Sequence, residues 1–402
     1  PYVAEIAVCG RGTPSNPIVI NGVTDASGAR PVITGAGATT PATMMPSTGK
    51  QIFNLGSDPV LVEGAGTIIL RRAVNEPDPD WKPAHIQIRN LSVTGAADEH
   101  TYTSLAGNTR NYSFSGGIYG RQSDDVLVEN CLIHGNTLGV FTHVNGAGRM
   151  YRCERWTIRS NRVYGNGRTG SNTEHGMYLQ GLQFTTEFNF LGQNKLGAGG
   201  ATSKHRVGQD IIRYNWIESH SRALDLVEME DQIPYNTSDP DESPNKPFYG
   251  IDYVYGNVII NDQNLPGGAS YRPIHYGADN AGEQTDGGAA MLPGPTHRKR
   301  LYFFNNTFVS NINGAAARNF IFQVSARDIV VELWNNVFYL SGNVPLHWTQ
   351  HAGTLNFRGT NLVYRTGGTL TNAQYDANAS NVLINYIGTV LQNDPKLLST
   401  DV

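Results

Sequence analysis

The sequence predicts an all-β protein, a solenoid of stacked coils that forms a single domain over residues 1–402. Three observations predict it. The chain holds 45 glycines among 402 residues and is also rich in asparagine, which indicates many tight turns. A short apolar segment, an asparagine and a second short apolar segment recur along the chain. No stretch combines helix-capping residues with helical apolar periodicity.

The recurring asparagine stands at successive intervals of 25 to 49 residues, and the longer intervals fit the shortest unit with an inserted loop. Asparagine tolerates the left-handed backbone conformation, and stacked asparagine side chains can bond to one another along a coil axis. A unit this short cannot bury its apolar face alone, so neighbouring coils must cover it. The nine repeat positions are Asn90, Asn130, Asn161, Asn189, Asn215, Asn257, Asn306, Asn336 and Asn361.

These units divide the chain into four stretches. We expect opening coils over 1–85, central coils with a candidate site over 86–230, long loop insertions over 231–298 and C-terminal coils over 299–402. A β-sandwich is the alternative fold. It needs hairpin turns at short regular intervals and does not explain an asparagine that recurs in one local frame.

The bulk composition narrows the class of partner. The formal net charge is −4 and charged residues make up 16%, too little positive charge for a surface that tracks nucleic acid phosphates. No apolar run is long enough for a membrane-spanning helix. Cys9, Cys131 and Cys153 show neither a disulfide framework nor metal-ligand spacing, so we expect buried thiols. The chain opens on the strand-like PYVAEIAV, and we expect a leader before it.

Counting back from the repeat asparagines places side chains in two columns on one sheet. The first column stands 11 residues before an asparagine and contains Tyr119, Tyr178 and Lys204. The second stands nine residues before it and contains Arg121, Gln180 and Arg206. Alternate residues of a strand point to opposite faces, so both columns should project outward. The same alternation adds Phe141, His143 and Asp225, with His175 at the start of its strand.

The segments HGMYL (175–179), TSKHR (202–206) and IIRYNWIESHSRALDLVE (211–228) resemble the central motif of bacterial β-helix proteins classed as polysaccharide lyases. The segment PSNPIVINGVTDASGARPVITGAGAT (14–39) resembles the first coils of the same group. The chain therefore resembles the right-handed parallel β-helix proteins of the pectate-lyase-like superfamily. This resemblance implies a monomer, secreted or periplasmic, that acts on an acidic polysaccharide.

An outward strip of aromatic and basic groups suits an extended anionic polymer, and β-elimination of a uronic acid chain is the expected reaction. The substrate carboxylate must be neutralised, a base must take the C5 proton, and an acid must assist the leaving oxygen. Arg206 suits the first role because of its fixed guanidinium fork. Lys204 suits the second, since a neighbouring cation favours the neutral amine. Tyr178 or His175 suits the third. Asp225 is expected to orient Arg206 or His175, or to hold a cation.

The remaining residues of the strip are expected to bind substrate: Tyr119, Arg121, Phe141, His143, Gln180, Arg222, Asp225 and His275. In one branch of the superfamily, a lysine base is followed at a similar distance by an arginine near bound Ca²⁺. Here Arg222 follows Lys204 by 18 residues and competes with Arg206 for the role of that arginine, for which column position favours Arg206. The cofactor is therefore either none or Ca²⁺, whose candidate ligands are Asp225, Glu228 and Asp231; a solvated acidic loop is the other interpretation.

The basic stretch 296–300 is either a rim of the cleft or a loop end.

Two other functions stay open. A glycoside hydrolase on the same fold needs two or three converging carboxylates, of which the strip offers Asp225 and, less directly, Glu228. A non-catalytic carbohydrate-binding β-helix would keep the aromatic and arginine residues. It would not need Lys204, Arg206 and His175 together.

Overall fold

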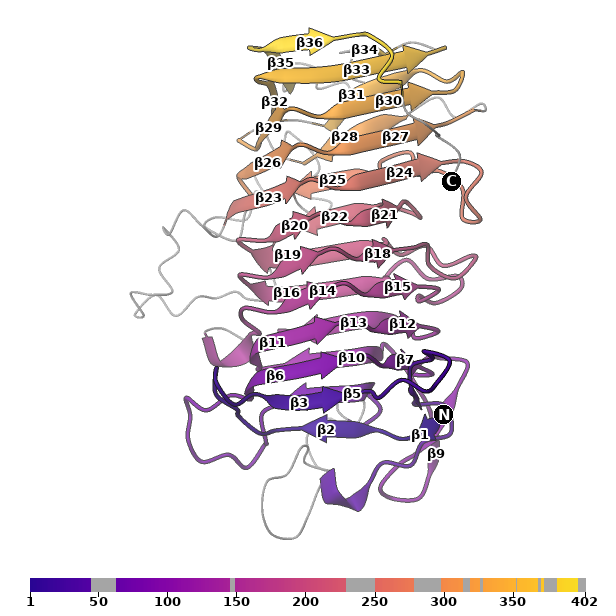
Figure 1. Ribbon diagram of the computed structural model, residues 1–402, viewed down its shortest axis with the longest axis vertical. Coiled ribbons are helices and arrows are strands. Elements are labelled where there is room, and N and C mark those ends of the chain that lie inside the picture. Colours follow the sequence, from indigo (N-terminus) through magenta and orange to yellow (C-terminus); the bar gives the residue numbers. More distant parts are fainter. Residues whose placement is uncertain are drawn as a thin grey trace.

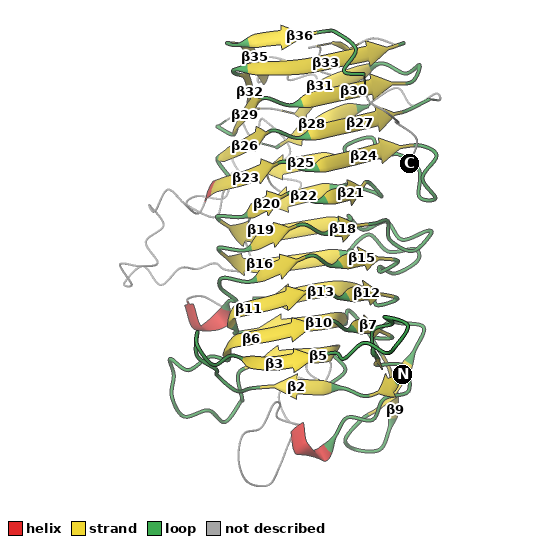
Figure 2. Ribbon diagram, viewed as in Figure 1, coloured by secondary structure: helices red, strands yellow, loops and turns green. Residues whose placement is uncertain are grey.

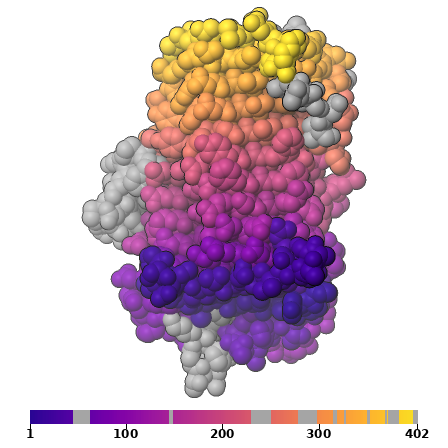
Figure 3. Space-filling view, viewed as in Figure 1, coloured from indigo at the N-terminus to yellow at the C-terminus, as the bar shows by residue number. Residues whose placement is uncertain are grey.

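The protein is a column of stacked coils, and the chain climbs this column in sequence order (Figures 1 and 3). The computed structural model describes residues 1–44, 63–144, 149–228, 250–277, 298–313, 319–325, 328–351, 353–367, 370–371 and 382–396. Regular structure in these ranges is almost entirely strand (Figure 2). Helix is limited there to two short 3-10 turns, η1 (Ala42–Met44) and η2 (Arg149–Tyr151). No helix in the described ranges is long and apolar enough to cross a membrane.

In the described part of the chain, the coil strands form three parallel sheets that the chain visits in turn. The first sheet consists of β1 (Tyr2–Val3), β4 (Val32–Thr34), β7 (Ser92–Thr94), β12 (Leu132–His134), β15 (Arg162–Tyr164), β18 (Phe190–Leu191), β21 (Trp216–Glu218), β24 (Val258–Asp262), β27 (Thr307–Asn311), β30 (Val337–Ser341), β33 (Thr360–Thr366) and β36 (Thr389–Leu391).

The second sheet carries the candidate site. It consists of β2 (Ile6–Val8), β5 (Gly66–Arg71), β10 (Gly116–Arg121), β13 (Leu138–His143), β16 (Met177–Leu182), β19 (Ser203–Gly208), β22 (Leu224–Val227), β25 (Ile274–Gly277), β28 (Phe320–Val324), β31 (Leu346–His351) and β34 (Leu370–Thr371).

The third sheet follows the second along the chain. It consists of β3 (Ile18–Asn21), β6 (Ala84–Arg89), β11 (Asp124–Glu129), β14 (Thr157–Arg159), β17 (Thr185–Glu187), β20 (Ile211–Arg213), β23 (Ile251–Tyr255), β26 (Arg300–Phe304), β29 (Val330–Trp334), β32 (Gly353–Phe357) and β35 (Val382–Tyr386). An antiparallel hairpin of β8 (Thr101–Thr103) and β9 (Thr109–Asn111) interrupts the coils between β7 and β10.

Each strand turns alternate side chains into one continuous core. In β6, Ala84, Ile86 and Ile88 are buried, and the residues between them are half-buried. The core cluster extends along the column from Ile33 to Val363. Each coil thus buries its apolar face against its neighbours, as the repeat predicted. The all-β solenoid is confirmed as a parallel β-helix. The sandwich alternative is wrong because the coil strands pair in parallel.

Asparagines form a buried ladder at the corner between the third and first sheets. Nδ2 of each residue donates to Oδ1 of the next at 3.0 to 3.3 Å. Each Oδ1 also accepts the backbone N–H of the preceding ladder residue at 2.8 to 3.1 Å. The ladder residues are Asn161, Asn189, Asn215, Asn257, Asn306, Asn336 and Asn361.

The predicted frame is wrong by one residue for Asn90 and Asn130. The left-handed position is the residue before the ladder asparagine, as Ser160 and Tyr214 show with φ of 57° and 56°. Asn90 and Asn130 occupy that earlier position, with φ of 58° and 52°, and Asn130 donates to Asn90 at 2.7 Å outside the core. Cys131 takes the inner position instead, and its N–H donates to Asn161 at 2.8 Å.

Two further expectations need correction. The stretch 231–298 does not consist of loop insertions alone, because β23, β24 and β25 complete a coil within it. Its segment DYVYGNVII, which carries ladder Asn257, forms most of β23 and β24. Cys131 and Cys153 are buried thiols as expected, and burial raises the pKa of each to about 11. Cys9 is only half-buried.

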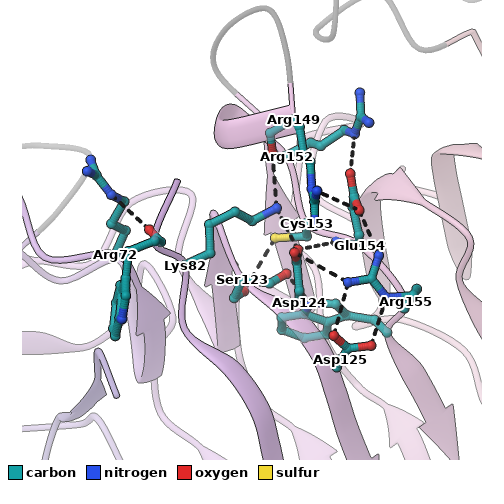
Figure 4. Close-up of polar contacts among 12 residues, drawn as sticks. Arg72, Lys82, Ser123, Asp124, Asp125, Arg149, Arg152, Cys153, Glu154 and Arg155 are labelled. Atoms are coloured by element: carbon teal, nitrogen blue, oxygen red, sulfur yellow. Dashed lines mark hydrogen bonds and ion pairs between the residues drawn. The ribbon is translucent and has the colours of Figure 1, made fainter. Parts of the chain in front are cut away.

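A buried cluster of charges holds the corner between the second and third sheets (Figure 4). Nζ of Lys82 lies 2.5 Å from Oδ1 of Asp124 and donates to the carbonyl of Arg149 at 3.0 Å. Asp124 also accepts the backbone N–H of Glu154 at 3.1 Å, and Glu154 pairs with Arg152 at 2.8 Å. These contacts tie the loop before β6 to the turn before β14.

Candidate active site

The first outward column of the second sheet has the predicted register. Residues in consecutive coils pair as Tyr119 with Phe141, Phe141 with Tyr178, Tyr178 with Lys204 and Lys204 with Asp225. The column continues from Asp225 to His275 and from His275 to Gln323. Parallel coils lie about 4.8 Å apart, so each member is one coil step from the next.

The second column pairs Arg121 with His143 and Gln180 with Arg206. Gln180 serves the scaffold, because its Oε1 accepts the backbone N–H of Val144 at 2.7 Å and its side chain is buried. The two columns therefore have the predicted register, but they do not form an open surface. Lys204, Arg206 and Asp225 are each less than 10% exposed.

A cavity of about 1070 Å³ opens over the middle of these columns. The predicted residues that line it are His175, Tyr178, Lys204, Arg206, Arg222 and Asp225. The predicted substrate-binding residues outside its lining are Tyr119, Arg121, Phe141, His143, Gln180 and His275. Tyr119 and Phe141 pack instead into an apolar cluster on the sheet, and His275 is fully buried. Burial thus explains why several outward residues do not reach the cavity.

The structure adds lining residues that the sequence did not predict: Phe114, Asn172, Thr173, Gly199, Ala201, Ser221, Ser270, Tyr271 and Arg272. One signal could have found Arg272. His175, Arg222 and Arg272 each stand three residues before the first-column residue of their coil, and all three line the cavity. The position three residues before the column is therefore a third row of the site.

Asp225 binds two cations and a histidine. Its Oδ1 lies 2.6 Å from Nη1 of Arg222 and 2.7 Å from Nδ1 of His275, and its Oδ2 lies 3.6 Å from Nζ of Lys204. Burial alone would raise the pKa of Asp225. Arg222, the His275 hydrogen bond and Lys204 outweigh it and hold that pKa well below its usual range. We expected Asp225 to orient Arg206 or His175; its partners are Lys204, Arg222 and His275 instead.

Arg206 connects Tyr178 to the end of the next strand. Its Nε donates to the Tyr178 hydroxyl at 3.0 Å, and its Nη1 donates to the carbonyl of Glu228 at 2.9 Å. The Glu228 carboxylate lies 3.3 Å from the same Nη1 and is fully buried. Nζ of Lys204 lies 5.6 Å from the centroid of the Tyr178 ring. Tyr178 therefore contacts Arg206 through its hydroxyl and faces Lys204 with its ring.

His175 sits against the edge of Tyr178, with ring centroids 5.2 Å apart. Its Nδ1 accepts the backbone N–H of Ala201 at 2.9 Å. A ring nitrogen that accepts an N–H cannot also carry a hydrogen, so the hydrogen of the neutral ring is on Nε2. A positively charged His175 would place two N–H groups against each other. The contact therefore favours the neutral ring.

Cations outnumber acids around the cavity. Its described lining contains the basic side chains Lys204, Arg206, Arg222 and Arg272, and Asp225 is the single carboxylate there. Of the candidate calcium ligands, Asp225 and Glu228 are paired with cations, and Asp231 lies outside the described residues. No group of three or more His, Cys, Asp or Glu side chains in the described ranges could hold a metal ion.

Arg298, from the basic stretch 296–300, is not on the rim of the cleft. Residues 296 and 297 lie outside the described part. Arg298 is fully buried and paired with Asp252. It donates to the carbonyls of Val227 at 2.8 Å and His205 at 3.0 Å. It therefore holds together β19 and β22 from the core side, behind the strands that carry Lys204 and Asp225.

Comparisons with known proteins return structural neighbours. No family model matches the sequence, and a search of curated proteins finds no match. An alginate lyase from Paenibacillus sp. str. FPU-7 aligns at 10% identity over 96% of this chain and 87% of its own, with a TM-score of 0.41. The catalytic unit of a GH87 α-1,3-glucanase from Streptomyces thermodiastaticus strain HF3-3 aligns at 12% identity over 97% and 69%, with a TM-score of 0.38. The function proposed below rests on the geometry of the cavity.

Proposed function

We propose that this protein is a polysaccharide lyase that cleaves a uronic-acid-containing polysaccharide by β-elimination. The observation that carries this proposal is the ring of Lys204, Arg206, Arg222 and Arg272 around one cavity with Asp225 as its described carboxylate. Four cationic side chains and one carboxylate on the lining of a single cavity give it a positive potential, which attracts an anionic ligand. A polymer with a carboxylate on its sugar units supplies that charge.

The geometry favours Tyr178 over Lys204 as the base. Arg206 donates to the Tyr178 oxygen at 3.0 Å and so favours the phenolate. Lys204 instead faces the Asp225 carboxylate, which favours the charged ammonium. The base that the sequence analysis assigned to Lys204 therefore passes to Tyr178, one coil step away.

In this assignment the residues that line the cavity carry out the steps of β-elimination together. Arg222 and Arg272 bind the substrate carboxylate and make the C5 proton more acidic. The Tyr178 oxygen takes that proton, the C4–O4 bond breaks, and a double bond forms between C4 and C5. The Lys204 ammonium gives a proton to the leaving oxygen. His175, with its hydrogen on Nε2, donates a hydrogen bond to the sugar rather than serving as the acid.

A glycoside hydrolase is supported less well by the same residues. It needs a pair of carboxylates about 5 to 10 Å apart across the scissile bond. Among the described lining residues only Asp225 is a carboxylate, and its oxygens already face Arg222, His275 and Lys204. We also propose that the protein is secreted or periplasmic, because a polymeric substrate of this kind lies outside the cell. A monomeric state is part of the same proposal.

The test is a screen of acidic polysaccharides for the ultraviolet absorbance of the unsaturated uronate that β-elimination leaves. Wild type should raise this absorbance on at least one polymer. Lys204→Ala should abolish the rise, and Lys396→Ala, the same change at an exposed C-terminal pair with Asp394, should not. Parallel reactions with EDTA measure any need for Ca²⁺. New reducing ends without the absorbance would identify a hydrolase, and binding without either product would identify a carbohydrate-binding protein.

A further inference from the structure

His275 occupies the first column directly after Asp225, yet its side chain is fully buried. Both ring nitrogens are engaged. Nδ1 lies 2.7 Å from Oδ1 of Asp225, and Nε2 lies 2.8 Å from Oγ of Ser325, the residue that follows β28. His275 therefore cannot contact substrate, although the sequence analysis expected it to. It can act on the cavity only through Asp225.

The order of carboxylate, imidazole and hydroxyl is also that of a serine nucleophile with its base and orienting acid. Access excludes this use here. Ser325 has no exposed surface, and its backbone N–H is bonded to the carbonyl of Tyr276 at 3.2 Å. An ester substrate could reach neither the hydroxyl nor an oxyanion site at that N–H. What the arrangement can still do is fix the orientation of a side chain.

Asp225 is the side chain that it fixes. Its Oδ1 receives both His275 and Arg222, which directs Oδ2 toward Nζ of Lys204 at 3.6 Å. Arg222 is held in turn by Gln323, whose Oε1 accepts from Nη2 at 3.0 Å. Gln323 is the column residue that follows His275. His275, one coil after Asp225, thus holds the carboxylate, and Gln323, one coil further on, holds Arg222.

We propose that His275 is a positioning residue for the elimination: it holds Asp225 so that Lys204 and Arg222 face the substrate, and Ser325 fixes its ring. This inference rests on the proposed lyase function. Displacing a reacting group by about 1 Å can cost about 100-fold in rate. Loss of the His275 contact would let the Asp225 carboxylate rotate, and Lys204 and Arg222 would lose their common partner.

The experiment compares four variants on the polymer that wild type cleaves. His275→Leu should lower kcat about 100-fold with little change in KM, because the residue lies behind the site. His275→Asn keeps an N–H donor near the place of Nδ1 and should recover most of the lost kcat. Ser325→Ala should cause a smaller loss. His134→Asn, at a half-buried histidine that lies 3.3 Å from a serine hydroxyl on the first sheet, should behave as wild type.

The pH profile separates positioning from a purely structural role. Among the described contacts of the His275 ring are Asp225 and Ser325. The charged groups Arg222 and Lys204 contact the other side of the Asp225 carboxylate. In His275→Leu, the basic limb of the kcat profile should move to lower pH, since Lys204 loses an oriented carboxylate. An unchanged kcat and profile in a folded His275→Leu would overturn the inference. If His275→Leu does not fold, two results together would overturn the inference: an unchanged kcat in Ser325→Ala and a large loss of kcat in His275→Asn.

A readout without substrate keeps this inference distinct from the lyase proposal. The reaction of the Lys204 amine with an amine-directed reagent can be followed against pH by peptide mass spectrometry. Labelling of Lys204 should begin at lower pH in His275→Leu than in wild type. A wild type that cleaves no acidic polysaccharide would end the lyase proposal alone. An identical labelling curve in the two proteins would end the positioning proposal alone.

Discussion

Lys204 and Asp225 are partners in register across β19 and β22, and Nζ of Lys204 lies 3.6 Å from Oδ2 of Asp225. Both side chains are buried, and Arg222 and His275 bind the other oxygen of the carboxylate. The carboxylate is therefore an anchor for the cations of the cavity. Its removal should affect folding as well as chemistry.

Asp225→Asn should lower the free energy of unfolding by about 3 kcal/mol at neutral pH, because it leaves buried cations without their counter-ion. The pKa of Asp225 is lowered in the folded state, so its contribution is present above the ordinary aspartate range and is lost as pH falls through the lowered folded value. Urea denaturation at neutral and acid pH measures both. Asp394→Asn, at an exposed pair, is the control and should change stability by less than about 1 kcal/mol. Equal losses of unfolding free energy in Asp225→Asn and Asp394→Asn would contradict the conclusion that Asp225 anchors the cations.

Tyr178→Phe should lower kcat by about 1000-fold or more, since it removes the oxygen proposed to accept the C5 proton. The ring still stacks on Phe141 at a centroid distance of 5.5 Å, so thermal stability should change little. Tyr119→Phe is the matched control, because its hydroxyl contacts His143 at 3.2 Å outside the cavity lining. Steady-state kinetics of both variants decide the point. Near-normal turnover by Tyr178→Phe would return the base to Lys204.

Stability should fall as pH rises from about 4.5 to about 7 because of Glu5. Burial, partly offset by hydrogen bonds from Thr40 and Tyr112, raises the pKa of Glu5 from 4.5 to about 7. The folded state then binds a proton that the unfolded chain has released, which costs about 3 kcal/mol by the top of this range. Glu5→Gln should flatten the dependence of the unfolding midpoint on pH. Glu99→Gln, at an exposed pair with Lys195 where the pKa is lowered, should leave that dependence as in wild type.

Asn257→Ala should destabilise the column far more than Asn130→Ala. Nδ2 of Asn257 donates to the carbonyls of Ile212 and Tyr255 at 2.9 and 3.1 Å, and its Oδ1 accepts the N–H of Asn215 at 2.9 Å. Buried groups left unpaired cost about 1 kcal/mol or more each, so a loss of about 3 kcal/mol is expected. Asn130→Ala should cost about 1 kcal/mol, mainly for alanine in the left-handed conformation at φ 52°. Chemical denaturation of both variants measures the difference, and similar losses would mean that the ladder adds no stability beyond its turns.

The spacing of the asparagines was enough to predict the coils and the pairing of Tyr178 with Lys204, and alternation along the next strand added Asp225 to that column. Alternation along a strand and stacking of equal units are properties of the backbone, so they can be counted from the chain alone. Alternation likewise placed His143 beside Arg121, and the count of residues back from the asparagines placed Gln180 with Arg206. That count rests on the asparagine frame. It failed by one residue at Asn90 and Asn130, because the pattern does not distinguish the left-handed position of a turn from the inward position that follows it.

The chemistry of the site depended on contacts that no local pattern contains. Asp225 and His275 are 50 residues apart, and Arg222 and Gln323 are 101 residues apart, yet each pair is in direct contact. Which carboxylate pairs with which cation, and whether an outward residue is exposed or covered, is set by side chains that distant segments bring together. The repeat therefore determines where a side chain stands on the column, and the packing of distant segments determines its partner, its burial and its charge.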